Sequence, residues 1–160
     1  MLFRSMPEKI DQTVDINRFH DLTKLLRVTA LVLKAVRSFK SQVTNKKSTE
    51  KEQMRLNAAD LKEAEHLWIR SVQGSAFSKE ITFLLSKDHS SAPPMYVTQF
   101  GLFLDEGIIK CKGRLNNAPL PVNTRNPILL PAKHEFTCLL IKQSHESVKH
   151  SGIRDTLTTL

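Results

Sequence analysis

The spacing of apolar residues predicts a long amphipathic helix near the start of the chain. From Phe19 to Phe39, apolar side chains recur every three to four positions over about five turns, the period of an α-helix with one buried face. Asn17 stands just ahead of this stretch and can cap the helix. Residues 41–55 are polar and charged without any period, so they predict a flexible linker.

Two further apolar stripes predict a pair of helices that pack as a hairpin. The first opens at Asn57, has Asp60 in its first turn and ends at Gly74, since glycine is favoured just after a helix. Ser75 can cap the second, which continues to Leu85. Because the connection between them is short, we expect the two helices to lie against each other.

The pattern changes after a pair of prolines at 93–94, where short apolar runs replace the helical stripes. The runs 102–104 and 108–115 flank an Asp-Glu-Gly turn at 105–107, which predicts a β-hairpin. Residues 127–131 form a short apolar strand with a proline at each end. Proline cannot donate a backbone hydrogen bond, so this strand suits the edge of a sheet.

Two histidines near the end of the chain are the best candidates for metal ligands. A helical stripe extends from Lys133 to His145, and His150 follows five positions later, just before Gly152. On one unbroken helix these two side chains would point roughly 140° apart. We therefore expect the helix to end between them, and a last helix to follow over 153–160. Two histidines that converge on one point are half of a four-ligand zinc site.

Taken together, these patterns predict an α+β fold that is mostly α. It consists of amphipathic helices with a small β-hairpin and a short edge strand that lead into the helical segment with the two histidines. The expected segments are 1–40 with one basic amphipathic helix, the linker 41–55, a helical hairpin at 56–92 and the module 93–160.

The positive charge of the chain is concentrated in its first third. The formal net charge is +8; residues 1–56 carry twelve Lys and Arg against six Asp and Glu, and residues 57–160 carry twelve against ten. Such a balance fits contact with a polyanion such as nucleic acid. The basic residues that flank the first stripe have two interpretations, a solvated face of a core helix or a helix that tracks phosphates. They are Lys24, Arg27, Lys34 and Arg37.

Several classes of protein do not fit this sequence. Only two cysteines occur, Cys111 and Cys138, so a disulfide scaffold is not indicated and a reducing compartment is the simpler assumption. The N-terminus lacks the pattern of a signal peptide, and no apolar run is long enough to cross a membrane. We expect an intracellular protein with no membrane partner, and the sequence does not decide between nucleus and cytoplasm.

The sequence also gives no support for an enzyme or for a small-molecule substrate. It has no paired carboxylates in a plausible site, no glycine-rich phosphate loop and no nucleophile with a base. Cys138 and His145 share a helix face but lie two turns apart, about 10 Å, which excludes a thiolate pair. Cys111 fits a small buried side chain, and His66, His89 and His134 fit isolated histidines without a ligand role.

The order of several short motifs carries a resemblance to a known family. The motifs are Asn17-Arg18-Phe19, Leu25-Leu26-Arg27-Val28-Thr29-Ala30, Asp60-Leu61, Ala64-Glu65, Gly113-Arg114-Leu115, Pro127-Ile128-Leu129-Leu130-Pro131, Leu140-Ile141, His145, His150, Gly152 and Thr156-Leu157. In this order the chain resembles part of the polyprotein of BEL/Pao-type retrotransposons, at the place where the integrase region begins. Residues 102–160 are similar to the N-terminal zinc-binding module of the His-His-Cys-Cys type.

The resemblance implies a non-catalytic part of an integrase region. Modules of this type bind zinc and form small helical bundles that assist multimerisation and engage element DNA. In the family a Cys-x-x-Cys follows the histidines by a few tens of residues, and the catalytic core lies further on. His145 and His150 are then two of four ligands, so we expect a truncated module with weak or no zinc binding, and the chain is interpreted as a retroelement remnant.

A second interpretation stays open beside the first. The chain can be a host-recruited module that binds nucleic acid or another protein through its basic N-terminal helix. DNA is a possible partner, and self-association is a further possibility that the family resemblance implies. The salt dependence of DNA binding separates these ideas, since phosphate contacts release counterions.

Overall fold

In the computed structural model the chain forms two compact units. The first unit combines Met1–Trp68 with Glu135–Leu160, and the second is Ile69–His134. The expected module 93–160 is therefore shared between both units. The structure describes residues 10–43, 55–86, 92–112, 119, 125–149 and 151–159.

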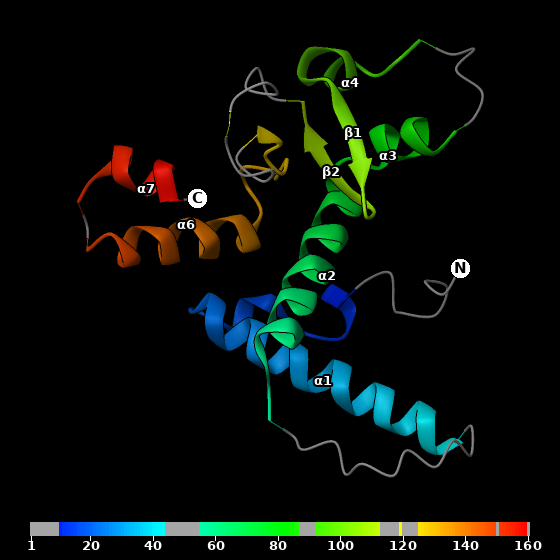
Figure 1. Cartoon of the computed structure of the whole chain (residues 1–160), viewed down its shortest axis with the longest axis vertical. Helices are drawn as coiled ribbons and strands as arrows, with labels where there is room; N and C mark the ends of the chain where they lie inside the picture. The colour runs from blue at the N-terminus through cyan, green and yellow to red at the C-terminus, as the bar shows by residue number, and fades with distance from the viewer. Residues whose placement is uncertain are drawn as a thin grey trace. The chain divides into compact units, whose positions relative to one another are not determined.

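The first unit is helical in its described part. Its elements are two short 3₁₀ helices, η1 (Ile10–Gln12) and η2 (Ile16–Arg18), then α1 (Leu22–Val43), the first part of α2 (Ala58–Ala76), α6 (Glu135–Ser147) and α7 (Ile153–Thr159). Helices α6 and α7 lie side by side, as Figure 1 shows in orange and red. The linker was expected over 41–55, but α1 continues through its first three residues, 41–43, and residues 44–54 lie outside the described ranges.

Helix α1 begins later than the sequence predicts. Asn17 lies in η2, and Asp21 is the residue that caps α1. Its carboxylate oxygen Oδ1 accepts the backbone N–H of Thr23 at 2.7 Å and that of Lys24 at 3.4 Å. The prediction that Asn17 caps this helix is wrong because Asp21 stands directly before the helical stripe and satisfies the first free N–H groups there.

The core of the first unit is built around the ring of Trp68. This side chain is fully buried, and its ring stacks on that of Phe136 from α6 with centroids 6.1 Å apart and planes 11° from parallel. The indole N–H donates to Thr29 Oγ1 of α1 at 2.9 Å, and the Thr29 hydroxyl donates to the Leu25 carbonyl at 2.9 Å. Helices α1, α2 and α6 thus meet at one aromatic side chain whose polar group is satisfied.

The second unit places three elements after the last turns of α2. They are α3 (Ser78–Leu85), α4 (Met95–Phe100) and a hairpin of β1 (Leu102–Asp105) and β2 (Ile108–Cys111) (Figure 1). Helix α4 was not expected from the sequence. Pro94 precedes its first residue, and a proline there suits a helix start because the first N–H groups have no helical partner.

Helix α2 continues past the glycine that was expected to end it. It runs to Ala76, and the φ of Gly74 is not in the left-handed region that glycine supplies at helix ends. Ser75 was expected to cap the next helix, but its hydroxyl donates back to the Val72 carbonyl at 2.9 Å. Both predictions are wrong, and the chain changes direction instead at Phe77, where φ is −122° and ψ is 37°.

The hairpin of β1 and β2 confirms the prediction made for this stretch. The strands are antiparallel, with Asp105 opposite Ile108 and Leu102 opposite Cys111. Glu106 and Gly107 form the two-residue turn with φ of 50° and 77°. Positive φ at both turn positions matches the twist of a tight hairpin, which favours glycine at the second one.

The apolar segment expected as an edge strand joins β2 through a single bridge. Ile128 pairs with Lys110 in antiparallel fashion. The Cys111 N–H donates to the Pro127 carbonyl at 2.9 Å, and the Leu129 N–H donates to the Ile109 carbonyl at 3.2 Å. The segment therefore lies along the free side of β2 and pairs with it at Ile128.

A buried glutamine on α2 connects this part of the second unit. Gln73 is fully buried. Its Nε2 donates to the carbonyls of Ile109 at 2.9 Å and Leu129 at 2.8 Å, and its Oε1 accepts the Ile109 N–H at 2.7 Å. One side-chain amide thus bonds to backbone groups of β2 and of the neighbouring segment, as a further strand would.

The observed fold class is the predicted one, mostly helical with a small two-stranded antiparallel sheet. In the part of the chain that the structure describes, no helix has the length and apolar character needed to cross a membrane.

Candidate functional site

The candidate metal ligand His145 lies in the last turn of α6, where it contacts α7. The side chain is half-buried, and its Nδ1 is 3.0 Å from Oγ1 of Thr156. Thr156 is a buried residue of α7, only 5% exposed. Its hydroxyl also donates to the carbonyl of Gly152 at 2.8 Å. The imidazole of His145 therefore has a fixed polar partner on the next helix.

The chain leaves the helical conformation soon after His145. Helix α6 ends at Ser147, so it ends between positions 145 and 150 as predicted. Lys149 and Gly152 have positive φ, 51° and 114°, and these two residues reverse the chain between α6 and α7. A Cβ on Gly152 would meet no atom within 4 Å, so glycine is favoured there by backbone conformation rather than by space. His150 lies outside the described residues.

The chemistry of His145 fits a zinc ligand, although the described residues do not make a complete donor set. Histidines that bind metal usually bond through their second ring nitrogen to an oxygen, as His145 does to Thr156. Within the described ranges, which leave out His150, no group of three His, Cys, Asp or Glu could hold a metal ion. Cys138 is exposed on α6. Burial raises the pKa of Cys111 on β2, which favours its neutral thiol over the thiolate that zinc prefers.

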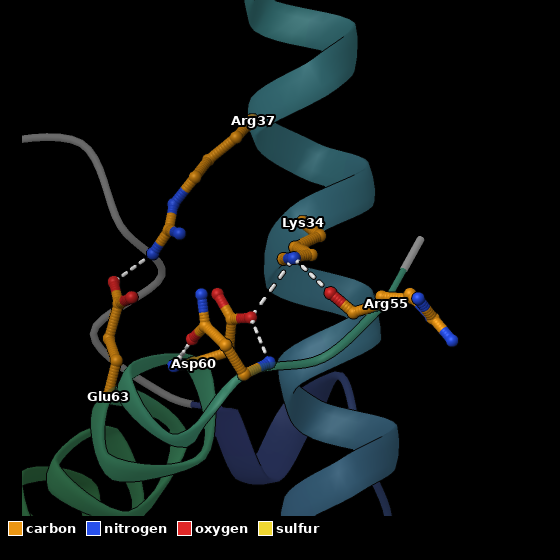
Figure 2. Close-up of polar contacts among 6 residues, drawn as sticks. Lys34, Arg37, Arg55, Asp60 and Glu63 are labelled. Atoms are coloured by element: carbon orange, nitrogen blue, oxygen red, sulfur yellow. Dashed lines mark hydrogen bonds and ion pairs between the residues drawn. The ribbon is translucent and has the colours of Figure 1, made fainter. Parts of the chain in front are cut away.

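Two of the four basic candidates on α1 are engaged within the first unit (Figure 2). Lys34 Nζ is 3.0 Å from Asp60 Oδ2 and donates to the Arg55 carbonyl at 2.7 Å. The exposed fractions of the Lys34 and Asp60 side chains are 12% and 10%, so this ion pair is largely buried. Arg37 forms an ion pair with Glu63 of α2.

The carboxylate that binds Lys34 also caps α2. Asp60 Oδ2 accepts the Asn57 N–H at 2.8 Å, and Asn57 Oδ1 accepts the Asp60 N–H at 2.8 Å. This reciprocal pair satisfies two N–H groups at the start of the helix, where Asn57 was predicted to lie. The Asn57 N–H, and after it the Lys34 ammonium, hold the pKa of Asp60 below its ordinary value. Asp60 therefore stays charged at neutral pH. Lys34 holds α1 and α2 together through this ion pair and does not offer its charge to a partner at the surface.

The other two basic candidates remain on the surface. Lys24 and Arg27, one turn apart on the N-terminal half of α1, are exposed. The structure places a third basic side chain near the start of α1 that the sequence pattern did not indicate. Lys142 of α6 donates to the carbonyl of His20, just ahead of α1, at 3.1 Å. Gln143 of α6 also donates to Thr23 at 3.1 Å. Only tertiary packing brings α6 to this end of α1, so no local signal could have shown it.

Thr156 is the second residue of the candidate site whose role the sequence did not show. It belongs to the short motif Thr156-Leu157, but a threonine eleven positions after a histidine gives no local sign of contact. Comparison with protein-family models, with curated proteins and with solved structures gave no match.

Proposed function

We propose that this chain is a non-catalytic module of a retrotransposon integrase region, one that engages DNA and contributes histidine ligands to a zinc site. The observation that supports the proposal is the placement of His145. It lies in the last turn of α6, shortly before the turn to α7, and its Nδ1 is hydrogen-bonded to the hydroxyl of Thr156. This arrangement suits a ligand whose orientation is held by its surroundings. The motif order that resembles the BEL/Pao family supports the same function.

Zinc titration tests the metal part of this proposal. Complete structural sites bind zinc with about 10–16 kcal/mol, so a site with two of four ligands should supply about half, a Kd of roughly 1–200 μM. Calorimetric titration of the 160-residue chain is expected to show binding in this range that His145→Ala abolishes. The matched control is His66→Ala, which removes a half-buried histidine from α2. Binding that survives His145→Ala, or no binding at all, would count against the two-histidine site.

A second candidate function is nucleic-acid binding through the basic face of α1. The exposure of Lys24 and Arg27 favours it, while the ion pairs of Lys34 and Arg37 remove those two residues from the face. The interface is therefore smaller than the sequence pattern implied, and two phosphate contacts from α1 are the most that these four positions supply.

The salt dependence of DNA binding measures this contribution. Each phosphate contact on duplex DNA contributes about 0.9 to the slope of log K against log salt. The double variant Lys24→Ala/Arg27→Ala is expected to reduce the slope of the wild-type chain by about 1.8. Lys62→Ala/Lys79→Ala, which removes two exposed lysines from α2 and α3, is the matched control and should not reproduce this loss. A wild-type slope near zero would exclude the α1 interface.

A further inference from the structure

The side chain of Thr156 is placed to decide which nitrogen of His145 carries the proton. Its Oγ1 lies 3.0 Å from His145 Nδ1 and 2.8 Å from the carbonyl oxygen of Gly152. Thr156 is 5% exposed, so its hydroxyl is shielded from bulk water, which could otherwise replace one of its hydrogen-bond partners. The two contacts join the last turn of α6, the residue directly before α7 and α7 itself.

The direction of these two hydrogen bonds follows from counting protons. A hydroxyl has one proton to donate, and a carbonyl can only accept. If Thr156 donates to the Gly152 carbonyl, its oxygen can only accept at Nδ1, and His145 must carry its proton there. A neutral imidazole has one N–H, so the lone pair is then on Nε2. Nitrogens with a lone pair are the ones that bind metal ions.

We infer that Thr156 is a positioning residue for the candidate metal site. It selects the tautomer of His145 with the proton on Nδ1 and makes Nε2 the ligand nitrogen. The inference about the tautomer concerns the metal-free chain and stands alone. Its consequence for zinc rests on the proposed function. Because Thr156 belongs to α7 and His145 to α6, the same contact links the ligand's orientation to the packing of the last helix.

The opposite arrangement is chemically possible and defines the test. The Gly152 carbonyl also accepts the Thr156 backbone N–H at 3.1 Å, so it would keep one partner if the hydroxyl turned toward Nδ1. His145 would then carry its proton on Nε2 and present no lone pair there. The two arrangements predict different protonated nitrogens on one side chain.

Nitrogen NMR of the histidine rings distinguishes the two tautomers. The metal-free 160-residue chain is labelled with ¹⁵N-histidine and measured near pH 8.5, above the usual imidazole pKa of about 6.5. Loss of signals in His145→Ala assigns the ring. The expected result is the Nδ1–H tautomer in the wild-type chain, with a shift toward a mixed population in Thr156→Val. An Nε2–H tautomer in the wild-type chain, or no change in Thr156→Val, overturns the inference.

Two further variants separate positioning from folding. Thr156→Ser keeps the hydroxyl and should restore the Nδ1–H tautomer. Thr158→Val removes another hydroxyl from α7, one that bonds to the Arg154 carbonyl at 3.2 Å and is exposed, and should leave the His145 ring unchanged. If Thr156→Val changes the tautomer only because α7 unfolds, its helix signals will be lost as well, and Thr156→Ser will show whether the hydroxyl itself is responsible.

Zinc affinity gives an independent readout. Loss of the group that hydrogen-bonds to a ligand histidine and orients its ring typically weakens metal binding by about 10–100-fold, and this is the expected effect of Thr156→Val. NMR can show the expected Nδ1–H tautomer while the titration shows no zinc binding, or binding that His145→Ala does not change. In that case the proposed metal function fails, and Thr156 still positions the ring. A wrong tautomer would contradict the positioning role whatever the zinc result.

Discussion

Replacement of Trp68 by alanine is expected to lower the free energy of unfolding by about 3–5 kcal/mol, the range for large aromatic side chains removed from a core. The residue is fully buried, stacks on Phe136 and donates its indole N–H to Thr29. The variant loses apolar burial, the ring contact and a hydrogen bond at once. Because Trp68 is the only tryptophan, urea unfolding must be followed by circular dichroism instead of fluorescence.

Phe39→Ala is the matched control for this prediction. Phe39 is also an aromatic residue on a helix of the first unit, but it is 67% exposed. Its replacement should change stability by less than about 0.5 kcal/mol. Equal losses in the two variants would show that Trp68 does not organise the core as the structure indicates.

Replacement of Gln73 by leucine is expected to have a comparable effect on the second unit. Leucine keeps apolar volume but leaves the Ile109 N–H and the Leu129 carbonyl without the partner that Gln73 supplies. A buried polar group left unsatisfied costs about 1–3 kcal/mol, so two cost about 2–6 kcal/mol. Hydrogen exchange should show the loss directly, with faster exchange of the Ile109 amide.

Gln99→Leu provides the comparison for this variant. It makes the same chemical change on α4, where the side chain is exposed. Little change in stability or in Ile109 exchange is expected there. If Gln73→Leu were as stable as wild type, the side-chain amide would not be needed to hold β2 and the neighbouring segment together.

Local pattern was enough to predict most of the elements in this chain. The stripe after Phe19, the turn at Glu106 and Gly107 and the helix that carries His145 were all found, because periodicity and turn residues act within a few positions. The errors were at the ends of helices. Asp21 rather than Asn17 caps α1, and α2 passes through Gly74, since several residues near a helix end can satisfy the same groups.

Local sequence pattern could not predict the roles of side chains whose partners lie far away in the sequence. Lys34 was indistinguishable in sequence from Lys24, yet one is paired with Asp60 and the other is exposed. Gln73 looked like one more polar position of a helix, although its partners lie 36 and 56 positions later. Each of these roles depends on which elements pack together, and a single sequence does not record that.

The first unit is made of two stretches of the chain, Met1–Trp68 and Glu135–Leu160, and this affects the order in which the chain can fold during synthesis. Trp68 leaves the ribosome 68 residues before its stacking partner Phe136. At about 5–20 residues per second, the ring waits about 3–14 s for that contact. The second unit is continuous in sequence, so all of its residues emerge within this interval. A nascent chain can therefore fold the second unit first. Until Phe136 emerges, the apolar faces of α1 and α2 that contact α6 stay exposed and accessible to chaperones.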